Sequence, residues 1–200
     1  MRSEHAVDEA LVTAATPADD AVGVISRHWY IAIVGNRSER KCSERLTSLG
    51  YENYVPIQQI KHTPKTGKTQ MKNKVVLPSL VFIHITEQDR RKKVAYLPFI
   101  YRFMTDSARR GQAGPPVAVV PDEQMMAFRR MVEHSELPVE IGPAELKFGD
   151  PVRVIRGRLS GMEGVVKRNT DGKSRLCISL DILGCAFVEI DKSFLEPITN

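Results

Sequence analysis

Apolar and polar positions along the first part of the chain predict a strand followed by a helix. The stretch "HWYIAIVG", from His28 to Gly35, is rich in aromatic and β-branched residues, as is typical of a central strand. In the next segment, "NRSERKCSERLTSLGY", Cys42, Leu46 and Leu49 are spaced by four and three residues. This spacing places them on one face of a helix, and we expect the helix to end at Gly50.

A lysine-rich segment separates the next two predicted strands. "YENYVPI" and "LPSLVFIHI" have strand character, and the polar residues between them contain Pro64 and Gly67. We expect a long loop here that protrudes into solvent. Its lysines are Lys61, Lys65, Lys68, Lys72 and Lys74.

The rest of the first 135 residues continues the alternation of helices and strands. A helix is expected across "EQDRRKKVAYL", then strands at Phe99–Met104 and in "VAVV". A last helix opens at Pro121 and Asp122. This alternation over about 110 residues predicts one α/β or α+β sandwich domain, an antiparallel sheet flanked by helices. The apolar stripe of the last helix is Met125, Phe128, Met131 and Val132.

The C-terminal quarter has only short strands separated by turn residues. It follows a segment with Pro138, Gly142 and Pro143, which we interpret as a linker. Strands at this spacing predict a small β-barrel of about 50 residues. The predicted division is a tail at 1–26, an N-terminal domain at 27–135, a linker at 136–147 and a barrel at 148–200.

Charge is distributed unevenly along the 200 residues. The first 26 hold one basic and five acidic residues, a net charge of −4 within a total of +5, so the remainder carries +9. We therefore expect a mobile acidic tail and a basic body that favours an anionic partner such as nucleic acid. The chain has neither an apolar run long enough to span a membrane nor a signal-peptide pattern, and we expect a cytoplasmic protein.

Catalytic and metal chemistry have no support in the sequence. Cys42, Cys177 and Cys185 lack metal-ligand spacing and are expected to be buried free thiols, and the five histidines form no ligand pair. The glycine-rich stretch "GRLSGMEGVV" (157–166) lacks the lysine of a phosphate-binding loop, and no helix follows it. Its glycines Gly157, Gly161 and Gly164 are instead expected at bends. We predict no cofactor, no metal, no catalytic residue and no enzymatic activity.

Several of these stretches resemble one protein family. "GDPVRVIRGRLSGMEGVVKRN" looks like a KOW motif, and "WYIAIVGNRSERKCSERL", "LPSLVFIHI" and "VVPDEQMMAFRRM" resemble the NusG N-terminal (NGN) domain. The chain is thus similar to the NusG family of transcription elongation factors over about residues 28–198. The resemblance implies an NGN sandwich followed by an SH3-like KOW barrel, in a monomer that is not an enzyme.

The resemblance also implies a partner and a contact surface. Members of the family bind the clamp helices of RNA polymerase through an apolar patch on the NGN domain and suppress pausing and termination. Matching "LPSL" to the family pattern assigns Leu77, Pro78 and Leu80 to this contact, with Ser79 in place of a glycine. Trp29, Tyr30 and Tyr54 are expected to border the same patch, although each also suits ordinary core packing.

Further contacts and alternatives follow from the same resemblance. The lysine-rich loop is expected to touch upstream or non-template DNA, and a solvated loop without a partner is an equal alternative. In the barrel, Leu159 and Leu183 stand where the family binds ribosomal protein S-ten or Rho. Leucines in place of aromatics, Cys185 and the acidic tail favour a specialised RfaH-like antiterminator of particular operons. The runner-up is an RNA-binding or ribosome-associated KOW protein without polymerase contact.

Overall fold

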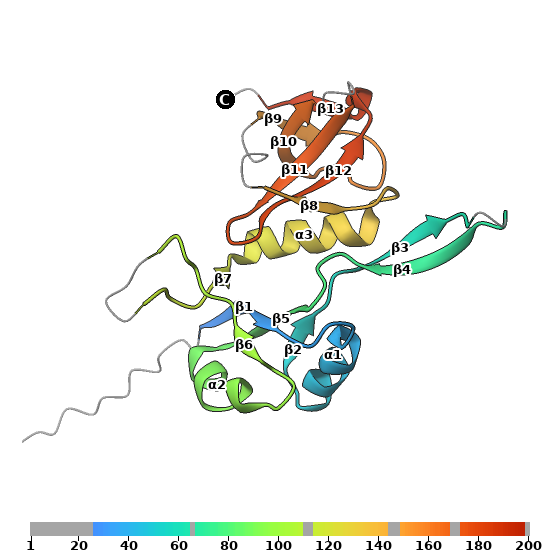
Figure 1. The fold of residues 1–200 in the computed structure, drawn as a ribbon. Helices are drawn as coiled ribbons and strands as arrows, with labels where there is room; N and C mark the ends of the chain where they lie inside the picture. The colour runs from blue at the N-terminus through green and yellow to red at the C-terminus, as the bar shows by residue number, and fades with distance from the viewer. Residues whose placement is uncertain (1–25, 65–66, 110–113, 144–148, 169–172, 199–200) are drawn as a thin grey trace, which may run out of the picture.

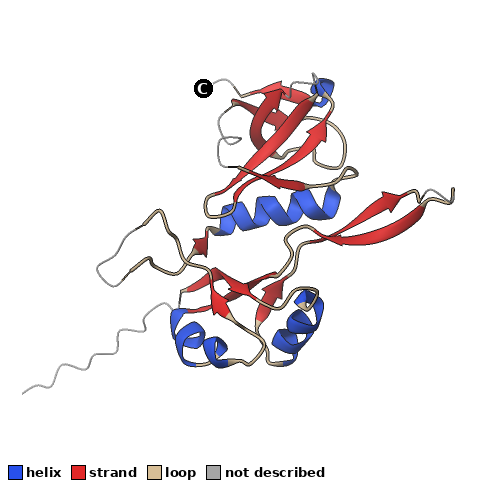
Figure 2. Cartoon of the chain, viewed as in Figure 1, coloured by secondary structure: helices blue, strands red, loops and turns tan. Residues whose placement is uncertain are grey.

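The computed structural model describes residues 26–64, 67–109, 114–143, 149–168 and 173–198. Residues 1–25 of the predicted acidic tail and Lys65 lie outside these ranges. The fold is a mixed one, with two larger antiparallel sheets, a separate two-stranded hairpin and few helices (Figures 1 and 2). This arrangement confirms the prediction of antiparallel sheets accompanied by helices.

The N-terminal sheet is built around its first strand. The strand order is β2-β5-β1-β6, and β7 also pairs with β1. All of these pairings are antiparallel. As in any β-strand, consecutive residues of β1 point to opposite faces. The strands are β1 (Arg27–Ile33), β2 (Glu52–Tyr54), β5 (Leu80–Thr86), β6 (Arg102–Phe103) and β7 (Val119–Val120).

Helices cover both faces of this sheet. α1 (Glu39–Ser48), α2 (Glu87–Lys92) and the short 3-10 helix η1 (Val94–Tyr96) lie on one side, and α3 (Asp122–His134) lies on the other (Figure 1). The helix predicted before Gly50 is confirmed as α1. The stripe of Met125, Phe128, Met131 and Val132 is fully buried in α3, as predicted. The helix expected across 87–97 is shorter than predicted, since it breaks at Lys93 into α2 and η1.

The segment expected to be a long lysine-rich loop is mostly a β-hairpin. β3 (Ile57–His62) pairs with β4 (Gln70–Val75), so the prediction of a loop from Lys61 to Lys74 was wrong for much of its length. The hairpin projects away from the rest of the molecule (Figure 1). Pairing between the two strands satisfies their backbone groups, so a largely polar sequence can form this hairpin. We call residues 57–75 the arm.

The C-terminal sheet has six strands in the order β13-β9-β10-β11-β12-β8. β8 lies within the range predicted as linker, and its Ile141 pairs with Ala186 and packs into the core. The glycines of the 157–166 stretch differ in role. Gly157 and Gly161 have φ of 80° and 82°, as expected for bends.

Gly164, by contrast, lies inside a strand rather than at a bend. A Cβ atom there would stand 2.6 Å from the carbonyl oxygen of Cys177 on the neighbouring strand, so close packing excludes a side chain. The strands of this sheet are β8 (Glu140–Gly142), β9 (Asp150–Val154), β10 (Glu163–Arg168), β11 (Ser174–Leu180), β12 (Gly184–Ile190) and β13 (Leu195–Pro197).

One hydrophobic cluster joins the two sheets through α3. It contains Trp29 and Phe82 of the N-terminal sheet, Phe128 of α3, and Leu176 and Ile178 of the C-terminal sheet. Figure 1 shows α3 lying between the sheets. The C-terminal sheet therefore packs on the N-terminal half through this helix.

Candidate binding surfaces

Four of the residues predicted to bind a polymerase lie on the α3 side of the N-terminal sheet. Trp29 and Leu77 belong to the cluster around α3, and Tyr54 and Leu80 pack against it while half-buried. Trp29 is 5% exposed and Leu77 9% exposed, so both are mainly core residues. Pro78 is exposed at the turn before β5. The structure thus brings Trp29, Leu77, Tyr54 and Leu80 to one side, where Tyr54 and Leu80 keep some exposed surface, and Pro78 lies in the adjoining turn.

Tyr30 lies on the opposite face of the sheet from Trp29. It is buried under α2 in a second hydrophobic cluster, together with Ile83 and Phe103, and its Oη donates a hydrogen bond of 3.0 Å to Glu87 Oε2. The Arg90 guanidinium carbon lies 5.4 Å from the centre of the Tyr30 ring. Burial, followed by the bond to Glu87, raises the pKa of Tyr30 to about 12. Tyr30 therefore does not border the same patch as Trp29, because adjacent strand residues point to opposite faces.

An arginine from α3 joins the two aromatic residues that do share this face. Arg129 lies over both rings, with its guanidinium carbon 4.9 Å from the Tyr54 centroid and 6.0 Å from that of Trp29. The indole also stacks on His84, with 4.8 Å between ring centroids. Such cation–π and stacking contacts fix the orientation of the rings. Burial raises the pKa of Tyr54, whose buried Oη has no hydrogen-bond partner within the described part of the chain.

The turn from Leu77 to Leu80 is held in place by Glu39, which is not among the predicted contact residues. Ser79 has a positive φ of 64°, a backbone conformation that glycine adopts more readily than serine. Its backbone N–H donates to Glu39 Oε1 at 2.6 Å, and Val34 N–H donates to the Ser79 carbonyl at 2.9 Å. Glu39 is only 4% exposed. Its proximity to this turn could not be read from the sequence, because 40 residues separate the two groups.

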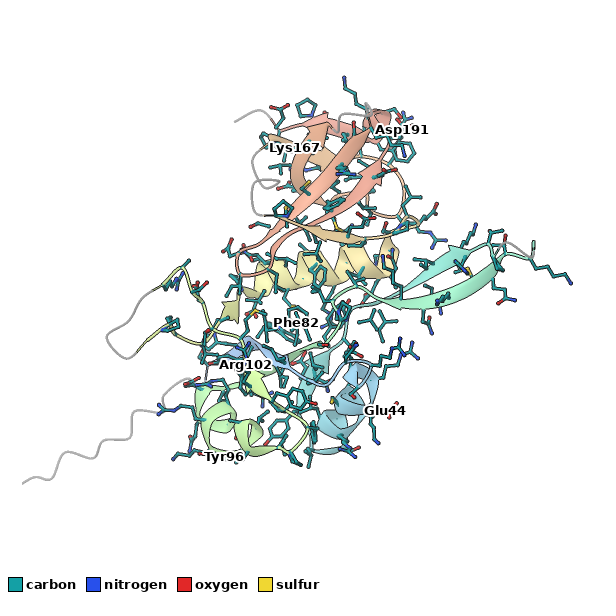
Figure 3. All side chains as sticks on the ribbon, viewed as in Figure 1. Glu44, Phe82, Tyr96, Arg102, Lys167 and Asp191 are labelled. Carbon is teal, nitrogen blue, oxygen red and sulfur yellow. The ribbon has the colours of Figure 1, made fainter. Side chains whose placement is uncertain are left out.

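The lysines of the arm do not share one face. In the register of the hairpin, Lys61 pairs with Met71 on one face, whereas Lys72 and Lys74 lie on the other. Lys68 is exposed beyond the strands, and Lys65 lies outside the described residues. The side chains of Lys61 and Lys72 are exposed, and that of Lys74 is half-buried. Figure 3 shows side chains on both sides of the hairpin ribbon. A flat anionic surface could therefore meet Lys72 and Lys74 together.

The two leucines predicted to bind a partner in the C-terminal sheet lie near α3. Leu159 is 8% exposed and belongs to the cluster around the helix, and Leu183 packs against it. Neighbouring backbone groups bind the helix directly. Arg130 donates to the carbonyl of Ser160, and the N–H of Asp181 donates to Gln124 Oε1 at 3.0 Å. Both loops are thus engaged by α3 in this arrangement.

Comparison with known proteins identifies the family. Residues 27–129, just over half of the chain, match the family described as "NusG: Transcription termination factor nusG". The chain belongs to the NusG family. No curated protein sequence gives a significant match. A solved structure titled "Domain interaction in Thermotoga maritima NusG" is similar, with 19% sequence identity and a TM-score of 0.47, covering 88% of this chain and 100% of that chain.

Membership of the NusG family fixes the broad function. NusG proteins are non-enzymatic transcription factors with a role in elongation and termination, and they generally bind RNA polymerase. The match covers the N-terminal sheet, the α1 and α2 side and the first part of α3, and it ends before the C-terminal sheet. The candidate polymerase surface therefore lies inside the matched region.

Three further observations concern the described ranges of this NusG-family chain. No three His, Cys, Asp or Glu side chains gather there as metal ligands would. The three cysteines, all within these ranges, are buried thiols rather than disulfides. Each helix in these ranges is too short or too polar to cross a membrane.

Proposed function

We propose that this protein is a transcription elongation factor that binds the clamp helices of RNA polymerase through the α3 side of its N-terminal sheet. In this proposal, residues 27–135 form an NGN domain, and binding suppresses pausing and termination. The observation that carries the proposal is that Tyr54 and Leu80 lie partly exposed on one face, next to the turn with Pro78, inside the region that matches the family.

The residues of this surface have two different tasks in the proposal. Pro78, Leu80 and Tyr54 make the contact, because each keeps exposed surface. Leu77 and Trp29 support them from the core, and Arg129 holds the Tyr54 ring in place. A small apolar contact with a few oriented aromatic groups is a common form of protein recognition.

The C-terminal sheet supplies a second contact in the proposal. We assign it to the KOW class, with Leu159 and Leu183 as the residues that bind a further partner, either ribosomal protein S-ten or Rho. Leu159 is buried and Leu183 half-buried in the arrangement described above, and α3 binds the neighbouring backbone. Binding of that partner would therefore require the loops at 157–161 and 181–183 to leave α3.

Substitutions at family positions support a specialised role. Leu77 and Leu80 stand in place of aromatic residues, and Ser79 in place of glycine, in the turn that forms the contact. We propose an RfaH-like antiterminator acting on particular operons, with the arm touching upstream or non-template DNA. Profiling of nascent transcripts with and without the protein would test this, since a housekeeping factor would affect elongation across the genome.

Replacing Leu80 with aspartate tests the polymerase contact. We expect Leu80→Asp to weaken binding to purified RNA polymerase at least about ten-fold, because a carboxylate would lose solvation in an apolar contact. Leu49→Asp is the matched control, since Leu49 is 53% exposed at the end of α1, on the other face of the sheet. Circular dichroism verifies that both variants fold. Unchanged binding by a folded Leu80→Asp protein would refute the proposed surface.

A further inference from the structure

A single buried amide joins the arm to the segment that leads into the C-terminal sheet. Gln58 lies in β3 and is 2% exposed, which is unusual for an uncharged polar side chain. Its Nε2 donates to the carbonyls of Leu137 at 2.8 Å and Ser135 at 3.3 Å, and its Oε1 accepts from the N–H of Val139 at 2.8 Å. The side chain thus binds three backbone groups of residues 135–139, which we call the strap.

The strap is a direct mechanical connection between two parts of the molecule. It begins at Ser135, the C-cap of α3, and continues without a break into β8, which starts at Glu140. β8 is the edge strand that pairs with β12 of the C-terminal sheet. Any movement of that sheet away from α3 would therefore pull on the backbone groups that Gln58 binds.

On its other side, Gln58 belongs to the base of the arm. It pairs with Lys74 across the hairpin, next to the pair of Ile57 and Val75. The arm leaves the molecule at this point, where the N–H of Val76 donates to the carbonyl of Pro56 at 2.8 Å. The position of Gln58 consequently helps to set the direction in which the arm projects.

We propose that Gln58 couples the orientation of the arm to the docking of the C-terminal sheet on α3. A buried amide needs its partners, because an unsatisfied polar group is costly away from water. When the sheet leaves α3 and the strap shifts, Gln58 loses these partners and the base of the arm loosens. When the sheet docks, the strap is fixed and the arm is held. Gln58 is a positioning residue in this scheme, and the coupling depends only on contacts within the chain.

Hydrogen exchange in a double-mutant cycle tests the coupling. Leu159→Asp serves to release the sheet, because Leu159 is buried and lines the same cleft as Ser135 and Leu137. If this substitution instead unfolds the sheet, the strap is released equally. The amides of Gln58, Val76 and Val139 report on the arm base and the strap. We expect Leu159→Asp to speed their exchange about ten-fold, the change that loss of one or two hydrogen bonds produces.

The decisive comparison is the same substitution without the amide. In the Gln58→Leu protein, amide exchange at position 58 of β3 and at Val76 should already be fast. Adding Leu159→Asp should then change these exchange rates less than about two-fold. Gln59→Leu is the matched control, because Gln59 is the exposed neighbour on the other face of β3. In the Gln59→Leu background the full effect of Leu159→Asp should remain.

A second variant keeps the test valid if Gln58→Leu does not fold. Gln58→Glu has the same shape and can still accept from the N–H of Val139, but its carboxylate cannot donate to the two carbonyls. We expect it to reduce the coupling in part. The proposal is overturned if Leu159→Asp leaves exchange at the arm base unchanged, or if it speeds exchange equally with and without Gln58.

Discussion

The turn that presents Pro78 and Leu80 depends on one carboxylate of α1. Glu39 accepts the N–H of Ser79 at 2.6 Å and is almost completely buried. Hydrogen bonds from backbone N–H groups to a charged acceptor are among the stronger ones in proteins. Ser79 also holds a left-handed backbone conformation that a serine rarely adopts. This carboxylate therefore positions the turn without touching any partner.

Removal of the Glu39 carboxylate should destabilise the fold. We expect Glu39→Ala to lower the free energy of unfolding by about 1–3 kcal/mol, because the N–H of Ser79 would lose its charged acceptor in a half-buried turn. Urea denaturation followed by circular dichroism measures the change. Glu44→Ala, at an exposed position of the same helix, should cost less than about 0.5 kcal/mol. Equal effects of the two substitutions would contradict this role of Glu39.

Among the elements, the arm combines a β-hairpin with an uneven distribution of lysines. Lys72 and Lys74 share one face with His62, whereas Lys61 lies on the other face beside Met71. A rigid hairpin can place only one face against a nucleic acid at a time. If DNA is the partner, the face with two lysines offers the stronger electrostatic attraction.

The salt dependence of DNA binding distinguishes the two faces. We expect Lys72→Ala combined with Lys74→Ala to reduce the slope of log affinity against log salt concentration by about 2, as each lysine bound to a phosphate contributes about 1. Lys61→Ala should leave the slope nearly unchanged. Fluorescence anisotropy with a labelled duplex measures the slopes. Loss of slope in Lys61→Ala alone would assign the contact to the other face.

Elements with a continuous apolar stripe could be predicted from the sequence, and short or largely polar strands could not. The stripe of α3 and the apolar strand at β1 carry a period that reflects burial. β3, β4 and β8 have weak apolar patterns, since their pairing partners stabilise them more than their own burial does. Trp29 and Tyr30 point to opposite faces because side chains alternate along a strand, so their separation could have been predicted from their adjacent positions. The contacts of Glu39 and Gln58 could not have been predicted, because they join residues far apart in the chain.

For the whole molecule, the position of α3 between two sheets predicts joint unfolding. A single apolar cluster extends from Trp29 through Phe128 to Leu176, and packing of this kind makes unfolding cooperative. We expect one calorimetric transition for the wild-type protein. Leu159→Asp should separate it into two, because the C-terminal sheet would lose its apolar contact with the helix.

An exposed neighbour of Leu159 provides the control for calorimetry. Ile155 is 43% exposed in the same region, so Ile155→Asp should keep a single transition. Two transitions in the wild-type protein would mean that the halves unfold independently despite the shared cluster.

The two-sided burial of α3 also determines how the chain can be shortened. A polypeptide ending at Ser135 would keep Met125 and Phe128 against the N-terminal sheet, with Phe128 still packed on Phe82. Ala127 lines a pocket together with Val165 and Ile178 of the C-terminal sheet, and Met131 lies one helical turn further along α3, so the truncation would open both to water. An apolar strip of this kind promotes self-association. The isolated N-terminal half should therefore precipitate or form dimers at concentrations at which the intact chain stays monodisperse, unless a polar residue replaces Met131.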